Sequence, residues 1–261
     1  MNANYGSYIP ISTVDWHGKA AVALFLRGCP FRCPYCQNYE ILEGSDLLEV
    51  KVLKDKIENS IPFVSSLVIS GGEPLIQKNI VKELASFAKE KGLLVGIHTN
   101  GFYPQVIDEL LQESLVDAFF LDIKAPMNDP IAYGKVIGRD EYNLDLEPKM
   151  VIEKITKSLD IISGSGAQLE LRTTVVPGIV GSKEDIAAIG QLLSPYVKDK
   201  DIPYVIQQGI PENAMSEGLR DTKPFTREEL LEMAKATYPF LHNVWIRTKE
   251  SGNEEVNFEF V

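Results

Sequence analysis

Cysteine thiols are the residues of this 261-residue chain whose spacing most directly implies chemistry. All three, Cys29, Cys33 and Cys36, stand within eight consecutive positions of the segment RGCPFRCPYCQN. Their odd number, and the reducing compartment expected for a chain without a signal peptide, argue against disulfides. A structural zinc ion normally takes four ligands, and none of the three histidines lies nearby in the sequence to supply the fourth. Thiolates also hold iron–sulfur clusters, and three thiolates on a four-iron cluster leave one iron open for a substrate or cofactor.

Further polar residues stand where short apolar runs end. Six runs have the length and composition of strands, at residues 20–28, 65–72, 92–101, 117–126, 167–178 and 202–209. Polar side chains close these runs: Glu73, His98, Asn100, Asp122, Lys124, Arg172 and Gln207. Glycine and proline simply end strands, but that explanation does not cover these side chains. Because ligand sites of parallel α/β folds lie at the carboxyl ends of the strands, we expect one site here.

Side-chain alternation within two of the runs supports the same expectation. Successive residues of a strand point to opposite faces, so Glu170 and Arg172 share one face, and Asp122 and Lys124 likewise share a face. We expect these polar sets to face the interior of a barrel, because the outward faces of barrel strands pack against helices. An ion pair with a purely structural role is the alternative for Asp122 and Lys124.

Helical patterns separate most of the strand runs. Apolar residues recur at three- and four-residue spacing within 76–87, 106–111, 152–162, 186–193 and 230–234, and Gly92 is positioned to end the first of these helices. Strands that alternate with helices predict an α/β fold with a parallel sheet. Six strands are fewer than the eight of a closed barrel, so a partial barrel and an open doubly wound sheet both fit the pattern.

Composition and charge set the remaining bounds. No Pro-, Gly- or Ser-rich linker divides the chain, so we expect one domain over residues 1–261, with a core at about 20–210 and a C-terminal extension at 211–261. The net charge of -11 argues against a nucleic-acid partner, which needs a concentrated basic face. We see no apolar run long enough to span a membrane and no signal peptide, so we expect no membrane partner and a cytoplasmic location.

The cysteine motif resembles that of the radical S-adenosylmethionine (SAM) superfamily. It has the spacing C-x3-C-x2-C, follows the first strand of the pattern, and carries an aromatic residue, Tyr35, directly before the third cysteine. The resemblance implies a partial (βα)6 barrel of six strands and a 4Fe-4S cluster held by Cys29, Cys33 and Cys36. It also implies that SAM chelates the open iron through its methionine amino and carboxylate groups. One electron from the reduced cluster would then cleave SAM and yield a 5′-deoxyadenosyl radical.

Further motifs extend the resemblance and imply a set of SAM-binding residues. SGGEP at 70–74 resembles the glycine–glycine–glutamate motif that binds the amino group of SAM. DIKAP at 122–126 resembles the D-x-K motif of glycyl-radical-enzyme activases, and LRTTVVPG at 171–178 resembles their arginine-bearing fifth strand. The cofactor-binding residues implied in this way are Tyr35, Gly71, Gly72, Glu73, Asn100, Asp122, Lys124, Arg172 and Gln207.

Within the superfamily, the segment from residue 12 to 38 resembles most closely the activating proteins of anaerobic ribonucleoside-triphosphate reductases. This resemblance implies hydrogen abstraction from a glycine of a partner glycyl radical enzyme, with a flavodoxin- or ferredoxin-type electron donor. Gln37 stands where activases commonly have histidine, and His98 stands where several have an aspartate that helps hold a monovalent cation. We therefore expect no monovalent cation at His98, for which a hydrogen-bonded core residue is the simpler interpretation.

Two other functions fit parts of the pattern. A radical SAM enzyme that acts on a small molecule, such as a deazapurine-type synthase, would share the cysteines and the SAM-binding motifs. An iron–sulfur electron carrier would share only the cysteines, and the GGEP and D-x-K motifs speak against it because a carrier needs no SAM pocket. The absence of further cysteines favours an activase without an additional ferredoxin-like domain.

Overall fold

The computed structural model describes residues 1–198 and 200–258, and the chain divides into two compact units. The first unit comprises Met1–Pro30, Asn38–Phe120 and Lys157–Leu169; the second comprises Phe31–Gln37, Leu121–Thr156 and the described residues from Glu170 onward. Strand β6 (Ala118–Asp122), helix α5 (Pro148–Ser163) and strand β7 (Gln168–Val175) each belong partly to both units. The expectation of one domain stays a prediction.

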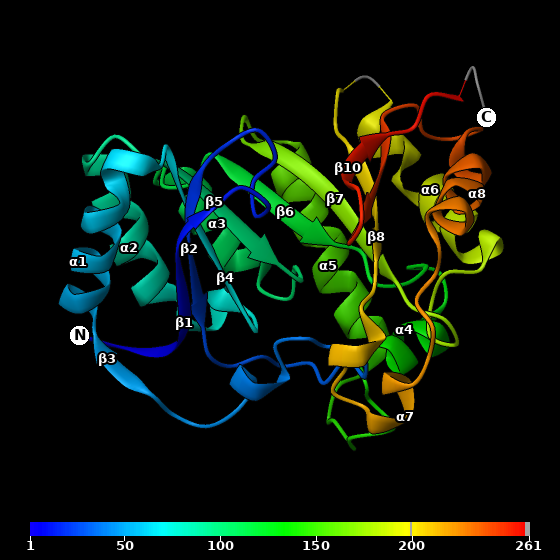
Figure 1. The fold of residues 1–261 in the computed structure, drawn as a ribbon, viewed down its shortest axis with the longest axis horizontal. Coiled ribbons are helices and arrows are strands. Elements are labelled where there is room, and N and C mark those ends of the chain that lie inside the picture. Colours follow the sequence, from blue (N-terminus) through cyan, green and yellow to red (C-terminus); the bar gives the residue numbers. More distant parts are fainter. Residues whose placement is uncertain (199, 259–261) are drawn as a thin grey trace. The chain divides into compact units, whose positions relative to one another are not determined.

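The first unit contains a mixed sheet with helices (Figure 1). Its strand order is β3-β1-β2-β4-β5, in which β2, β4 and β5 are parallel and β1 is antiparallel to both neighbours. The strands are β1 (Asn2–Ser12), β2 (Ala21–Leu26), β3 (Leu47–Glu49), β4 (Ser66–Gly71) and β5 (Leu94–Thr99). The helices are α1 (Val50–Ser60), α2 (Lys78–Glu90) and α3 (Pro104–Gln112), with short 3-10 helices η1 (Tyr39–Ile41), η2 (Ile61–Phe63) and η3 (Pro74–Gln77).

The core of the first unit follows the apolar pattern of the sequence. Leu84, in the middle of α2, is fully buried, and Gly92 has a φ of 78° just after that helix, as predicted for its C-terminal stop. At one end of the sheet, Trp16 meets Phe120 edge-on, with ring centroids 5.5 Å apart. Aromatic pairs of this geometry stabilise a fold by more than the burial of their surface alone. The contact therefore holds the loop that carries Trp16 against the strands.

The second unit contains the strand order β7-β8-β9-β10, with β7, β8 and β9 parallel and β10 antiparallel to β9. The strands that follow β7 are β8 (Tyr204–Gln208), β9 (Val244–Thr248) and β10 (Gly252–Glu255). The helices are α4 (Pro130–Val136), α6 (Lys183–Val197), α7 (Glu217–Arg220) and α8 (Arg227–Thr237), with a short 3-10 helix η4 (Pro211–Asn213). Ser182 and Thr226 start α6 and α8 with capping boxes, which satisfy backbone N–H groups of the first turn.

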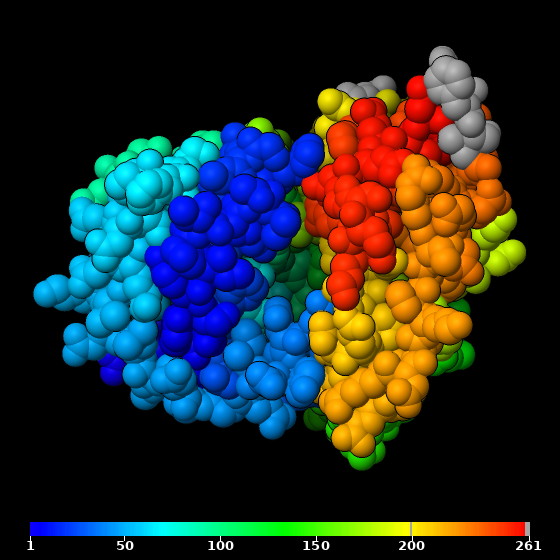
Figure 2. All heavy atoms as spheres, in the orientation of Figure 1, coloured from blue at the N-terminus to red at the C-terminus, as the bar shows by residue number. Residues whose placement is uncertain are grey.

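The elements that the sequence did not predict include β1, α1 and β10. Gly6 and Pro10 interrupt the alternation of β1, and the register of β1 against β2 shifts on both sides of the segment from Ser7 to Ile9, which accommodates these residues. Figure 2 shows β1, in dark blue, at the surface of the first unit. The strand β10, GNEE, carries no apolar residue, so only its pairing with β9 defines it.

The predicted α/β class is confirmed. All six predicted strands form, as β2, β4, β5, β6, β7 and β8, and each of the five predicted helical patterns lies in a helix. The parallel strands joined by helices are compatible with a partial (βα)6 barrel. Within residues 1–198 and 200–258, no helix is both long and apolar enough to cross a membrane.

Candidate active site

The first cysteine lies in the first unit, on a loop that begins where β2 ends. Gly28 has a φ of 105°, which glycine adopts without strain, and turns the chain away from the strand. The Arg27 side chain closes the loop by donating to the carbonyl oxygens of Glu40 at 2.7 Å and Glu43 at 2.9 Å. Cys29 is therefore presented by an internally bonded loop at the carboxyl end of a buried strand.

Two glycines bring the end of β4 close to this loop. A Cβ atom on Gly72 would lie 2.3 Å from the carbonyl oxygen of Gly28 and 3.0 Å from the Cβ of Cys29. A Cβ atom on Gly71 would lie 2.0 Å from the carbonyl oxygen of Leu26. These distances leave no room for a side chain at either position, so the glycine pair is required for this close packing of backbone.

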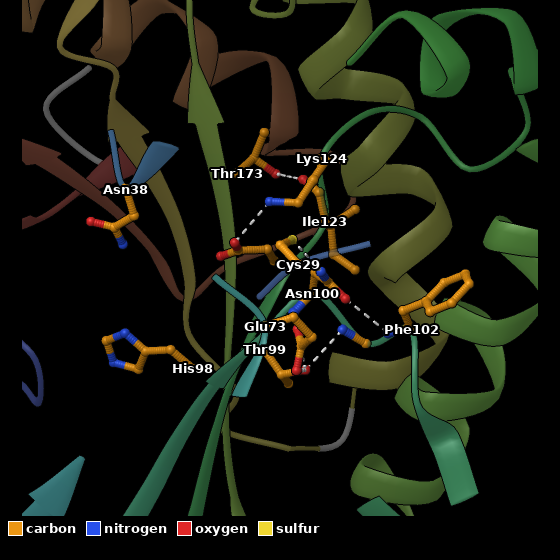
Figure 3. Close-up of polar contacts among 12 residues, drawn as sticks. Cys29, Asn38, Glu73, His98, Thr99, Asn100, Phe102, Ile123, Lys124 and Thr173 are labelled. Atoms are coloured by element: carbon orange, nitrogen blue, oxygen red, sulfur yellow. Dashed lines mark hydrogen bonds and ion pairs between the residues drawn. The ribbon is translucent and has the colours of Figure 1, made fainter. Parts of the chain in front are cut away.

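Glu73 is fully buried, and the chain itself supplies donors to its carboxylate. The carboxylate accepts from the backbone N–H of Leu75 at 3.1 Å, the hydroxyl of Thr99 at 3.0 Å and the backbone N–H of Asn100 at 2.7 Å. Figure 3 shows Glu73, Thr99 and Asn100 together. Such partners compensate the loss of water around a buried charge. Glu73 thus holds the residues after β5 beside those after β4, and its binding to the amino group of SAM stays a prediction.

We expect Glu73→Gln to destabilise the protein by about 2 to 4 kcal/mol. Glutamine keeps one acceptor oxygen but turns an NH2 group toward the three donors, which leaves at least one buried donor unmatched. Urea unfolding followed by circular dichroism measures the change. Glu83→Gln is the matched control, because Glu83 pairs with Lys54 at the surface, and it should cost less than about 1 kcal/mol. Equal stabilities of the two variants would contradict the buried network.

Asn100 lies beside the first cysteine, and its amide group is oriented by the backbone. Its Oδ1 accepts from the backbone N–H of Phe102 at 3.0 Å, so its Nδ2 is the group that faces the Cys29 sulfur, 3.8 Å away (Figure 3). The structure thus brings together two predicted site residues of the first unit. Hydrogen bonds to the sulfur atoms are one means by which proteins adjust the reduction potential of iron–sulfur clusters.

His98 connects β5 to the loop that precedes β2. Its Nε2 lies 2.8 Å from the carbonyl oxygen of Asp15, and its Nδ1 lies 3.5 Å from the hydroxyl of Ser70. Its ring also meets Phe120 edge-on, at a centroid distance of 4.8 Å. These contacts agree with the interpretation of His98 as a hydrogen-bonded residue, and the absence of a monovalent cation there stays a prediction.

The second and third cysteines lie in the second unit on one tight turn. The backbone N–H of Cys36 donates to the carbonyl oxygen of Cys33 at 2.9 Å, and Arg32 N–H donates to the carbonyl oxygen of Ile137 at 3.0 Å. Cys33 is buried, and burial raises the pKa of its thiol to about 11. Ligation of a metal by this thiol therefore releases a proton.

Lys124 and Asp122 form the ion pair that the sequence left open as an alternative. The Lys124 ammonium lies 3.0 Å from the Asp122 carboxylate, and the two side chains are 12% and 40% exposed. Burial opposes the charged form of Lys124, but Asp122, Tyr35 and Cys33 outweigh it and raise the pKa of Lys124 well above its ordinary value. Lys124 is thus a fixed cation, and its partially exposed partner can still accept hydrogen bonds from a ligand.

A cluster of charged residues on β7, β8 and β9 extends the site beyond the predicted residues. Glu170 accepts from Arg172 Nε at 2.5 Å and from Arg247 Nη2 at 3.1 Å, and Arg247 Nη1 donates to Gln207 Oε1 at 3.1 Å. The shared face of Glu170 and Arg172 is therefore confirmed. The sequence analysis did not include Glu170 or Arg247 among the site residues. The same alternation in VWIRT was the available signal for Arg247.

Asn38 is a further residue that the sequence analysis did not assign. It stands two positions after the third cysteine, and its Nδ2 donates to the carbonyl oxygen of Gly71 at 3.0 Å within the first unit. The segment that follows the cysteine motif is therefore bonded to the glycine pair at the end of β4. Asn38 thus holds the end of β4 beside the segment that follows the third cysteine.

The predicted site residues fall into two sets, one in each unit. The first unit contains Cys29, Gly71, Gly72, Glu73 and Asn100, and the second contains Cys33, Tyr35, Cys36, Asp122, Lys124, Arg172 and Gln207. The chain itself links the sets, because only three residues separate Cys29 from Cys33. That spacing allows at most about 14 Å between their Cα atoms in any conformation.

The residues present fit an iron–sulfur cluster and an amino-acid cofactor. The chain offers three thiols and no fourth, and the close packing of Gly72 on Gly28 holds the end of β4 against the loop that carries Cys29. The fixed ammonium of Lys124 and the guanidinium of Arg172 suit a carboxylate group of a ligand. The Asp122 carboxylate beside Lys124 suits an ammonium or hydroxyl group.

Comparisons with known proteins agree with this donor set. The family model described as the radical SAM superfamily matches residues 24–188. A protein of Methanocaldococcus jannaschii named as a putative glycyl-radical enzyme activating enzyme is 36% identical over 249 residues, which are 95% of this chain and 97% of that protein. The pyruvate formate-lyase-activating enzyme of Clostridium pasteurianum is 27% identical over 186 residues, which are 69% of this chain and 71% of that enzyme.

Solved structures support the fold alone. A radical SAM methyltransferase from Sphaerobacter thermophilus has a TM-score of 0.66 at 12% identity, covering 89% of this chain and 67% of that chain. Archaeal TYW1 has a TM-score of 0.58 at 17% identity, covering 92% of this chain and 80% of that chain. At identities of 12% and 17%, these structures resemble this chain in the arrangement of strands and helices only.

Proposed function

Because this chain belongs to the radical SAM superfamily and, within it, to the glycyl-radical enzyme activating enzymes, we propose that its partner is an anaerobic ribonucleotide reductase. The reaction is hydrogen abstraction from the α-carbon of one glycine of that partner, which leaves a backbone radical there. The family uses SAM and an iron–sulfur cluster, and we propose the 4Fe-4S type. A flavodoxin- or ferredoxin-type protein would supply the electron.

The observation that carries this proposal is the set of three cysteine thiols, with no fourth in the chain. Three thiolates can hold a four-iron cluster and leave one iron without a protein ligand, which is where an amino-acid cofactor can bind. The choice of an anaerobic ribonucleotide reductase rests on the resemblance of residues 12–38 to the activating proteins of those enzymes.

When bound, the reduced cluster and SAM supply a 5′-deoxyadenosyl radical, which is a strong hydrogen-atom abstractor. The residues of this chain bind and orient the cofactor. Lys124 and Arg172 would offer cationic groups to its carboxylate, and Asp122 would accept from its hydroxyl or amino groups. Gly71 and Gly72, packed on the backbone of Leu26 and Gly28, hold the end of β4 beside the loop that carries Cys29. Asn100 donates to the sulfur of Cys29 at 3.8 Å.

A glycine loop of the partner is the substrate that suits this chemistry. A radical of this reactivity must be kept from water while SAM is cleaved. After β8 the chain continues into α7, α8, β9 and β10, and the last two complete the sheet of the second unit. We therefore infer that the partner's own loop closes the site when the radical forms.

Isotope transfer tests the proposal. The reconstituted protein, SAM and dithionite are mixed without oxygen, with a ribonucleotide reductase that carries glycine deuterated at the α-carbon. We expect SAM cleavage to be slow without the partner and to quicken at least about tenfold with it, because the closed site excludes water and completes the reacting geometry. Deuterium should appear in 5′-deoxyadenosine, and a glycyl radical should appear in the electron paramagnetic resonance (EPR) spectrum.

The control is the same partner with alanine at the radical-bearing glycine, which should give neither label transfer nor a glycyl radical. Pyruvate formate-lyase in place of the reductase tests the choice of partner, and label transfer from it alone would replace the proposed partner. A small molecule that accelerates cleavage and donates the label by itself would overturn the activase proposal.

A further inference from the structure

We propose that Arg247, on β9, is a positioning residue of the SAM site that acts through Glu170 on Arg172. The inference rests on the proposed function, in which Arg172 contacts SAM. It adds the C-terminal part of the chain to the residues that determine SAM affinity. Arg247 lies outside residues 24–188, the region that the family model matches.

The three side chains form one buried cluster around a single carboxylate. Glu170 Oε1 accepts from Arg172 Nε at 2.5 Å and from Arg247 Nη2 at 3.1 Å. The side chains of Arg172, Glu170 and Arg247 are 7%, 12% and 16% exposed. At such burial, charge pairs are screened little by water, and removal of one partner leaves the others uncompensated.

Arg247 is itself held by groups from three strands. Besides Glu170 on β7, its Nη1 donates to Gln207 Oε1 on β8 at 3.1 Å, and its Nε donates to Asn253 Oδ1 on β10. A planar guanidinium with three separate nitrogens bonded has a fixed plane, which the single ammonium of lysine cannot reproduce.

The strand register shows how the Arg247 side chain reaches Glu170. Arg247 pairs with Gln207, and Gln207 pairs with Thr174, so Arg247 is level with Thr174 in the parallel sheet. Glu170 stands four residues earlier on β7, toward the start of the strand. The Arg247 side chain therefore extends toward the start of β7, where it contacts Glu170. The Glu170 carboxylate also accepts from the Nε of Arg172, so it links the two guanidinium groups.

The side chains of the cluster suit an anionic ligand. Two guanidinium groups share the Glu170 carboxylate, and a guanidinium matches the geometry of an anionic group such as the carboxylate of SAM. Outside this cluster, an ion pair between Glu254 of β10 and Arg227 of α8 attaches the β9–β10 hairpin to that helix. A substitution of Arg227 therefore weakens the attachment of the hairpin without removing a member of the Arg247 cluster. Arg227 offers a matched control for Arg247.

A double-mutant cycle on SAM affinity tests the inference. The SAM dissociation constant is measured by anaerobic calorimetry on reconstituted wild type, Arg247→Met, Arg172→Met and the double variant. We expect Arg247→Met to weaken SAM binding about tenfold or more, with iron content unchanged. The double variant should bind no more weakly than Arg172→Met alone, because Arg247 acts through Arg172. Arg247→Lys should not restore affinity, and Arg227→Met should bind SAM as the wild type does.

Additive effects in the cycle would overturn the inference, since they would mean that Arg247 acts independently of Arg172. Wild-type affinity in Arg247→Met would overturn it as well. If Arg247→Met does not retain iron, its SAM affinity cannot be interpreted, and Glu170→Gln is measured instead. This substitution keeps the shape of the side chain and removes the negative charge that the two arginines share. A wild-type SAM affinity in Glu170→Gln overturns the inference, and a loss of about tenfold supports it. Failure of label transfer from the partner leaves this cycle intact, whereas absence of SAM binding by the wild type refutes the proposed function itself.

Discussion

Replacement of Cys33 by alanine is expected to remove the iron–sulfur cluster completely. The reconstituted wild type should hold about four iron and four sulfide per chain, and Cys33→Ala should hold none, because two thiolates cannot retain a cluster that already lacks a fourth. The same result is expected for Cys29→Ala and Cys36→Ala, since the chain contains no other cysteine that could substitute. Iron and sulfide assays, together with visible absorption, measure the loss.

Tyr35→Phe is the control for this experiment. Tyr35 lies between Pro34 and Cys36 on the same turn and is buried, so the variant perturbs the turn while it leaves all three thiols in place. It should retain the full cluster content. One equivalent of zinc in the wild type, without an iron chromophore, would contradict the cluster assignment.

Gly71→Ala is expected to destabilise the first unit so strongly that little folded protein accumulates. The φ of Gly71 is 134°, and a Cβ atom there would lie 2.0 Å from the carbonyl oxygen and 2.5 Å from the nitrogen of Leu26. Leu26 is the residue that pairs with Gly71 across β2 and β4, so no side-chain movement can relieve the clash. We expect a cost above about 4 kcal/mol, measured by thermal unfolding.

Gly166→Ala is the matched control for that substitution. A Cβ atom on Gly166 would meet nothing within 4 Å beyond its own chain neighbours, and the φ of this glycine is not positive. Its replacement should change stability by less than about 1 kcal/mol, and a small stabilisation is expected because alanine restricts the unfolded chain. A Gly71→Ala variant as stable as Gly166→Ala would show that β2 and β4 do not approach as described.

The sequence predicted those features that depend on local patterns. The helix stop at Gly92 and the shared face of Glu170 and Arg172 follow from backbone preferences and strand alternation, and both are present. The resemblance implies Gly71 as a cofactor-binding residue, and in the structure the space of its missing Cβ is filled by the backbone of Leu26 in its own sheet.

The features that the sequence did not predict depend on contacts between distant segments. Two of the three donors to Glu73 come from Thr99 and Asn100, 26 and 27 positions later, and no local pattern predicts these two contacts. Arg247 reaches Glu170 across 77 positions, through a strand whose register is set only by the folded sheet. The strand β10 contains Asn253, which holds Arg247, but its polar sequence reads as a tail.

The two tryptophans of the chain are distributed so that each unit has its own optical reporter. Trp16 packs on Phe120 in the first unit, and Trp245 lies on β9 of the second, two residues before Arg247, with its Nε1 donating to Asn243 at 2.7 Å. In Trp16→Phe the tryptophan emission, excited selectively over the tyrosines, comes from the second unit alone, and in Trp245→Phe it comes from the first. Fluorescence can therefore follow each half of the molecule separately during unfolding. Emission from Trp245 can also be monitored as SAM is added, at a position beside the charged cluster on β9.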